Sequence, residues 1–263
     1  MSFVTYHHHG SDSEAPAYLA VPRGEGRWPA VVVVQDVLGM TADLRRTADR
    51  LAENGYIALA PALYAGGLKI RCLISTLRAA SAGIGTGYAP LVAARAFLQA
   101  DERCTGKVGL LGFCMGGQLA LQLSVGGLFD ACASNYGVLP KDLHALRDAC
   151  PVVASYGAKD LIARRGSAAR LDAALAQGDV PRDIHEYPDV GHGFINDWRF
   201  SGPVRFIESA VGASYSADEA EDAWRRMLEF FKSHLSVDGS PAPGPAGDGG
   251  EKSATPPDPV GPA

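Results

Sequence analysis

A cysteine flanked by glycines is the first candidate for chemistry, in the segment Gly112-Phe-Cys114-Met-Gly116. An apolar strand pattern ends just before it, and a helical pattern begins just after it. A sharp strand-to-helix turn presses the backbone against neighbouring chain two residues before and after the nucleophile, which favours glycine at 112 and 116. The helix N-terminus would favour thiolate over thiol, and the N–H of Met115 would face a developing oxyanion. The spacing predicts a nucleophile, although a buried cysteine in a packing turn is the alternative.

A thiol nucleophile needs a base within hydrogen-bond reach, so the seven histidines are the candidates. Three lie in the N-terminal run 7–9, which we interpret as a solvated terminal segment. Three more fall in a loop, a strand and the last helix (His144, His185 and His234). His192 lies in Asp189-Val-Gly-His-Gly-Phe, a glycine-flanked loop after the predicted strand 183–187. We expect its ring to reach the sheet edge beside Cys114.

An acid must then fix the imidazole tautomer and stabilise the imidazolium. Asp160 closes the run Pro151-Val-Val-Ala-Ser-Tyr-Gly-Ala-Lys-Asp, a strand and short turn. The chain order nucleophile, acid, histidine is that of α/β-hydrolases. Asp189 is the rival acid, but a side chain three residues away in a loop rarely reaches the ring nitrogen in a triad geometry.

The elements around these residues alternate between short β-branched runs and helical patterns, which predicts a mostly parallel sheet. We expect strands at 30–36, 57–61, 107–112, 131–136, 151–156 and 183–187, and helices at 42–53, 88–100, 115–124, 166–177 and 217–235. The sequence Ser216-Ala-Asp-Glu219 predicts a capping box before the last helix. Reactive residues at strand ends place the site at the carboxyl edge of the sheet.

Four motifs together resemble the dienelactone hydrolase family over residues 15–235. They are Gln35-Asp36-Val37-Leu38-Gly39, Gly112-Phe-Cys-Met-Gly-Gly, Tyr156-Gly-Ala-Lys-Asp160 and Tyr187-Pro-Asp-Val-Gly-His192-Gly-Phe. The resemblance implies an α/β-hydrolase fold, with a mostly parallel central sheet and helices on both faces. It also implies a Cys114–His192–Asp160 triad that opens an ester or lactone through a thioester acyl-enzyme, without metal or organic cofactor.

The resemblance extends to supporting residues. The family has an acid that contacts the resting nucleophile and helps to activate it, and Asp36 stands where the best-known members carry Glu. The N–H of Val37 would be the second oxyanion donor. Arginines that hold a substrate carboxylate have no counterpart at position 196, which is Asn. Arg71, Arg78 and Arg199 are the candidates to replace them.

Composition limits the other function classes. With 263 residues, 47% hydrophobic and 20% charged, the chain can bury one large α/β domain. A net charge of −5 with no basic cluster disfavours nucleic acid as a partner, and the longest apolar run, 30–34, is too short to span a membrane. Five cysteines (Cys72, Cys104, Cys114, Cys132 and Cys150) without a C-x-x-C pair indicate free thiols in the cytoplasm.

Beyond residue 235 the composition changes to Pro, Gly, Ser, Ala and Asp. We therefore expect an α/β-hydrolase domain over 1–235 and a disordered tail over 236–263. Two other functions stay open at this point. One is a thioesterase or another cysteine hydrolase, including a glutamine-amidotransferase-like enzyme, although Gly193 and Phe194 offer no acid beside the histidine. The other is a non-catalytic protein of the same fold that binds a small molecule. The oligomeric state is not predicted.

Overall fold

One eight-stranded sheet forms the centre of the molecule in the computed structural model, which describes residues 1–7, 14–63, 88–198 and 214–237. Its strand order is β1-β2-β4-β3-β5-β6-β7-β8. The six strands β3 to β8 pair with one another in parallel, whereas β2 pairs antiparallel with both β1 and β4. The strands are β1 Ser2–His7, β2 Glu14–Ala20, β3 Trp28–Val34, β4 Ile57–Pro61, β5 Cys104–Phe113, β6 Ala131–Asn135, β7 Val152–Gly157 and β8 Arg182–Tyr187. This is the predicted α/β-hydrolase architecture.

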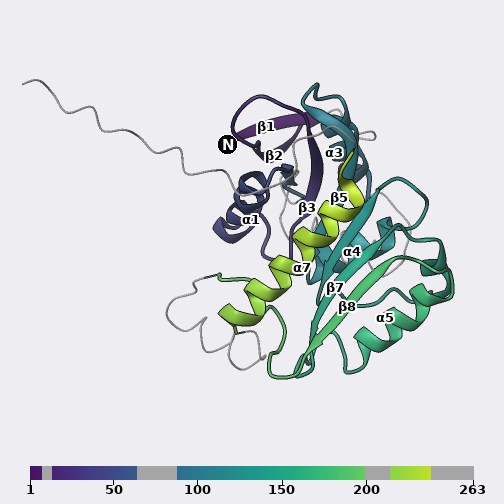
Figure 1. Cartoon of the computed structure of the whole chain (residues 1–263). Helices are drawn as coiled ribbons and strands as arrows, with labels where there is room; N and C mark the ends of the chain where they lie inside the picture. Colours follow the sequence, from purple (N-terminus) through teal and green to yellow (C-terminus); the bar gives the residue numbers. More distant parts are fainter. Residues whose placement is uncertain (8–13, 64–87, 199–213, 238–263) are drawn as a thin grey trace, which may run out of the picture.

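Helices cover both faces of the sheet (Figure 1). On one face lie α1 (Ala42–Glu53) and α7 (Ala217–Leu235), and on the other lie α3 (Ala89–Gln99), α4 (Met115–Leu123) and α5 (Ser167–Ala176). A short 3-10 helix, η2 (His144–Asp148), precedes β7. Strand β3 is buried along its whole length because its side chains alternate between these two cores. The predicted two-sided burial of this strand is confirmed.

The sequence predicted the central elements to within about three residues, with differences near the two ends of the described chain. Ser2–His7 pairs with β2 as an edge strand that the sequence pattern did not predict, because only Tyr6 of this strand is buried. His7, the first residue of the run 7–9, is exposed and forms an ion pair with Glu14, whereas His8 and His9 lie outside the described residues. The predicted capping box was wrong: the hydroxyl of Ser216 donates to the Glu219 carboxylate instead of capping a backbone N–H.

The turn between β5 and α4 is tightly constrained by neighbouring backbone. Cys114 lies at φ 52°, ψ −118°, and caps α4. A Cβ on Gly112 would lie 2.1 Å from the carbonyl oxygen of Gly116, and a Cβ on Gly116 would lie 2.3 Å from that of Val34. The glycines therefore let β5, α4 and β3 meet at one point.

Helix α7 ends at Leu235, and residues 238–263, on which most of the predicted tail falls, lie outside the described residues. Within the described ranges, no helix is both long enough and apolar enough to cross a bilayer.

We expect Gly116→Ala to destabilise the fold by about 3 kcal/mol or more, because its methyl group would collide with the backbone of β3. Gly126→Ala is the control: Gly126 also has a positive φ, 96°, but open space around it. That change should cost only about 1 to 2 kcal/mol for the left-handed conformation. Urea unfolding would measure both, and equal losses would contradict the proposed backbone contact.

Candidate active site

The site lies at the carboxyl edge of four adjacent strands. In the sheet register, Val34 pairs with Gly112, Phe113 with Asn135, and Asn135 with Ser155. Strands β3, β5, β6 and β7 therefore end at nearly the same level. The residues that follow them, among them Asp36, Cys114, Tyr136 and Asp160, leave the sheet side by side, as the sequence order predicted.

His192 and Asp160 form a buried hydrogen-bonded pair. Nδ1 of His192 lies 2.8 Å from Oδ2 of Asp160, and both side chains are almost fully buried. The other carboxylate oxygen of Asp160 accepts the backbone N–H groups of Ile162 and Ala163, at 2.7 and 2.9 Å. The rival acid, Asp189, is exposed and pairs instead with Lys159. The structure therefore brings His192 together with Asp160 and not with Asp189.

The charges of this pair stabilise each other. Burial opposes charge on both groups, but the hydrogen bond to His192 and the two backbone donors leave the pKa of Asp160 below its usual value. Burial lowers the pKa of His192, but the hydrogen bond to Asp160 and the neighbouring Cys114 sulfur outweigh this effect, and the pKa rises to about 9. An imidazolium next to Asp160 and Cys114 is thus favoured at neutral pH.

Cys114 is half-buried and faces this imidazole. The other ring nitrogen, Nε2 of His192, is buried and makes no hydrogen bond within the described part of the chain. Cys114 nevertheless lies close enough to raise the pKa of His192. A buried polar atom without a partner is costly, so its retention beside a thiol fits a group that exchanges a proton with that thiol.

Asp36 is buried at the end of β3, and both of its carboxylate oxygens accept hydrogen bonds. Oδ1 accepts the N–H of Leu38 at 2.7 Å, and Oδ2 accepts the indole N–H of Trp198 at 3.1 Å. Burial raises the pKa of Asp36, and these two donors oppose the rise. Trp198 also packs over Gly193, where an added Cβ would lie 2.6 Å from its ring. Trp198 therefore joins Asp36 to the loop that carries His192.

A buried network of Tyr136, Asn196 and Asp43 packs against the His192 ring. Tyr136, at φ 40°, packs edge-on against His192 with ring centroids 5.0 Å apart. Its hydroxyl donates to the side-chain oxygen of Asn196, and the Asn196 amide donates to Asp43 at 2.6 Å. Asp43 in turn accepts from Arg46 at 2.9 Å. Position 196, where no clamp arginine was found, thus serves an internal network.

The sequence motifs did not indicate the parts played by Tyr136 and Trp198. Tyr136 directly follows β6, so the rule that placed Asp36 and Asp160 at strand ends could have found it. Nothing in the local sequence indicated Trp198, because its contact with Asp36 joins residues far apart in the chain. Such a contact is determined by the tertiary fold alone.

The remaining predicted residues are placed in part. Met115 is the first residue of α4, directly after Cys114, and Val37 directly follows Asp36 in the turn closed by Gly39. Arg71, Arg78 and Arg199 lie outside the described residues. In the ranges that the structure covers, no three His, Cys, Asp or Glu side chains are arranged to hold a metal ion.

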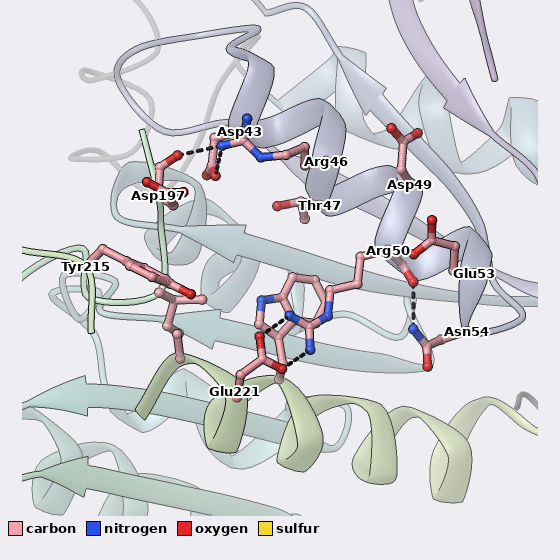
Figure 2. A pocket seen from close by; sticks show the side chains of 13 residues that line it. Asp43, Arg46, Thr47, Asp49, Arg50, Glu53, Asn54, Asp197, Tyr215 and Glu221 are labelled. Carbon is pink, nitrogen blue, oxygen red and sulfur yellow. Dashed lines mark hydrogen bonds and ion pairs between the residues drawn. The ribbon is translucent and has the colours of Figure 1, made fainter. Parts of the chain in front are cut away.

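A cavity of about 600 Å³ lies between α1 and α7, and residues of both helices line it (Figure 2). Its charged walls are largely paired: Arg50 binds Glu221 through two hydrogen bonds and stacks over Trp224, and Arg46 bridges Asp43 and the carbonyl of Asp197. None of Cys114, His192 and Asp160 lines this cavity. We therefore locate the chemistry at the sheet edge rather than here.

Comparison with known proteins agrees with this geometry. The model of the dienelactone hydrolase family matches residues 15–235. The chain belongs to this family. It is a hydrolase of ester or lactone substrates, and the fold and family expected from the sequence are confirmed.

Individual relatives cover most of the chain. A protein of Escherichia coli O157:H7, provisionally named a carboxymethylenebutenolidase, is 31% identical over 238 residues, with 83% of this chain and 82% of the relative covered. A relative from Methylorubrum extorquens with the same provisional name is 29% identical, with 85% and 78% covered. A crystal structure from Klebsiella pneumoniae, provisionally named a dienelactone hydrolase, matches at a TM-score of 0.69 and 26% identity, with 88% and 99% covered.

The raised pKa of His192 predicts a pH-dependent stability. A group whose pKa rises on folding contributes stability below its unfolded value, near 6.5, and loses it as the pH passes its folded value, about 9. In Asp160→Asn that pKa should fall, because the carboxylate no longer opposes the effect of burial. Between pH 6.5 and 9.5 the wild type should lose about 1 to 3 kcal/mol more unfolding free energy than this variant.

Asp189→Asn is the matched control, since it removes an exposed acid three residues from His192. It should retain the pH dependence of the wild type in the same urea titrations. If Asp160→Asn retains that dependence too, the buried ion pair is not its source.

Proposed function

We propose that the protein hydrolyses a carboxylic ester or lactone with Cys114 as nucleophile, His192 as acid and base, and Asp160 as the orienting acid. One observation carries this proposal. His192 bonds Asp160 through Nδ1 and keeps the opposite, buried ring nitrogen without a hydrogen-bond partner in the described ranges, while the strained Cys114 lies beside it. This is the arrangement in which a base is oriented by one neighbour and serves another.

The first half of the reaction forms an acyl-enzyme. The Cys114 thiolate attacks the carbonyl carbon, and the oxyanion is stabilised by the N–H groups of Met115 and Val37. When the C–O bond to the leaving group breaks, the His192 imidazolium gives its proton to the departing alkoxide or enolate. The product is a thioester on Cys114 and a neutral imidazole.

The second half releases the acid. Neutral His192 takes a proton from water as the water oxygen attacks the thioester carbonyl. The C–S bond then breaks, the carboxylic acid leaves, and the thiolate and imidazolium are restored. Over the cycle His192 gives one proton to the leaving group and regains one from water. The scheme therefore requires neither metal nor organic cofactor.

Asp36 is proposed to control the reactivity of the resting thiol. A carboxylate near a thiol opposes thiolate formation by like-charge repulsion. The hydrogen bonds from Leu38 and Trp198 support this role, because they hold Asp36 buried beside the loops that carry the triad.

Two alternatives remain distinguishable by experiment. A thioesterase would use the same triad but prefer thioesters to oxygen esters and butenolides in a turnover screen. A non-catalytic binding protein would give no turnover at all.

The cysteines support a proposal about location. Cys104, Cys114, Cys132 and Cys150, the cysteines of the described residues, are all free, which supports a reducing compartment such as the cytoplasm.

Cys114→Ala should abolish hydrolysis and leave the melting temperature nearly unchanged, because a smaller side chain still fits the turn. Cys114→Ser should also be poor, since a serine alkoxide needs a stronger base than a site arranged for thiolate supplies. Cys150→Ala, at a half-buried thiol just before β7 and so at the opposite edge of the sheet, is the control and should stay active. Wild-type-like turnover in Cys114→Ala would remove Cys114 from the nucleophile role.

Asp36→Asn should move thiol reactivity and turnover in opposite directions. Removing the charge should speed alkylation of Cys114 by iodoacetamide at neutral pH. Turnover should fall if the carboxylate takes part in activation. Asp142→Asn, at an exposed acid beside η2, should change neither quantity. If Asp36→Asn leaves both within about twofold, under roughly 0.5 kcal/mol, Asp36 has no part in activation.

A further inference from the structure

Exposed apolar side chains gather around the candidate nucleophile. Nine large hydrophobic residues of the described chain are exposed, and five of them lie in three loops at the carboxyl edge of the sheet. They are Val37, Leu38, Val138, Leu161 and Ile162, which we call the apolar rim. Clustering of exposed apolar residues at one place marks a binding surface, whereas scattered ones need no explanation.

The three loops flank Cys114 on both sides. Val37 and Leu38 follow β3, which pairs with one side of β5, and Val138 follows β6, which pairs with the other. Cys114 itself donates its N–H to Asn135, three residues before Val138, at 3.0 Å. The first rim segment, Val37 and Leu38, and the second, Val138, therefore leave the sheet at the level of the nucleophile.

The third rim segment is part of the turn that holds Asp160. The N–H of Ile162 bonds one carboxylate oxygen of Asp160, and the other oxygen bonds His192. Leu161 lies between Asp160 and Ile162 and is 75% exposed, more than any other large hydrophobic residue of the described chain. Nothing in the folding of this turn explains an exposed leucine there.

Two of the three rim loops lack positive charge. The loops 35–40 and 136–140 contain no basic residue. Asn196, four residues after His192, is buried and forms hydrogen bonds with Tyr136 and Asp43. The basic residues next to the rim in sequence are Lys141, Lys159, Arg164 and Arg165; all four are exposed, and Lys159 is paired with Asp189.

We infer that the apolar rim binds the hydrocarbon part of an uncharged ester or lactone, so that the enzyme prefers neutral apolar substrates to ones carrying a carboxylate. This inference rests on the proposed function, because it gives the rim a role only if Cys114 is the nucleophile. Val37 would then act twice, through its N–H toward the oxyanion and through its side chain toward the substrate.

The test measures kcat/KM for para-nitrophenyl acetate, butyrate and hexanoate and for the hydrogen adipate, which replaces the terminal methyl of the hexanoate by a carboxylate. A fully buried methylene is worth roughly fourfold, and a partly open rim supplies less. We expect the hexanoate to exceed the acetate by about tenfold and the adipate by at least as much. A parallel series of acetate esters with lengthening alcohols covers the case in which the rim binds the leaving group.

Leu161→Ser and Leu38→Ser should each lower the long-chain to short-chain ratio at least about threefold. Their rates of Cys114 alkylation by iodoacetamide should stay within about twofold of wild type, which shows that the triad is undisturbed. Leu128→Ser is the matched control: Leu128 is exposed but precedes β6, at the opposite edge of the sheet. Its ratio should equal that of the wild type.

Flat ratios in both series, in a wild type whose hydrolysis still requires Cys114, would overturn the rim and spare the proposed function. A preference for the adipate over the hexanoate would also overturn it, and its loss in Arg164→Ala or Arg165→Ala would identify the arginine responsible. A wild-type dimer that Leu161→Ser converts into a monomer, with unchanged ratios, would show that the rim is an interface between two copies. Hydrolysis that persists in Cys114→Ala would instead defeat the proposed function itself.

Discussion

The close approach of three backbone segments at the end of β5 determines where everything else in the site can lie. Gly112 touches the first turn of α4, and Gly116 touches the last carbonyl groups of β3. These contacts hold Cys114 in a conformation that L-residues rarely adopt, φ 52°. The strain is sustained because the sheet on both sides and the helix behind over-determine the turn. As a result, the Cys114 backbone is fixed at the carboxyl edge of the sheet, between the ends of β3 and β6.

The loops after β7 and β8 meet the turn with a buried charge pair. A buried ion pair is stabilising only when its geometry is good and its remaining acceptors are satisfied. Asp160 meets this condition through His192 on one oxygen and two backbone N–H groups on the other. Behind the ring, Tyr136 packs against His192 and is itself fixed by Asn196. The imidazole is therefore oriented by contacts from two other strand ends, those of β6 and β7.

Local sequence pattern was enough for the central strands and for the order of Cys114, Asp160 and His192, because buried parallel strands and sharp glycine turns have strong local signatures. It was not enough for β1, an edge strand in which only Tyr6 is buried and which therefore has little apolar pattern. Nor was it enough for the hydroxyl of Ser216, which donates to a carboxylate in place of capping a backbone N–H. The contact between Trp198 and Asp36 spans most of the chain and could not be predicted from spacing. The same holds for the exposure of Leu161, which depends on how the Asp160 turn folds.

The central claim is that hydrolysis passes through a thioester on Cys114. The most direct test mixes the enzyme with excess para-nitrophenyl ester, stops the reaction with acid within the first turnover, and measures the mass of the intact protein and of its peptides. The account predicts one added acyl group on the peptide that contains Cys114, removable by neutral hydroxylamine as a thioester is, and absent from Cys114→Ala. An acyl group on another residue, or full turnover by Cys114→Ala, would contradict it.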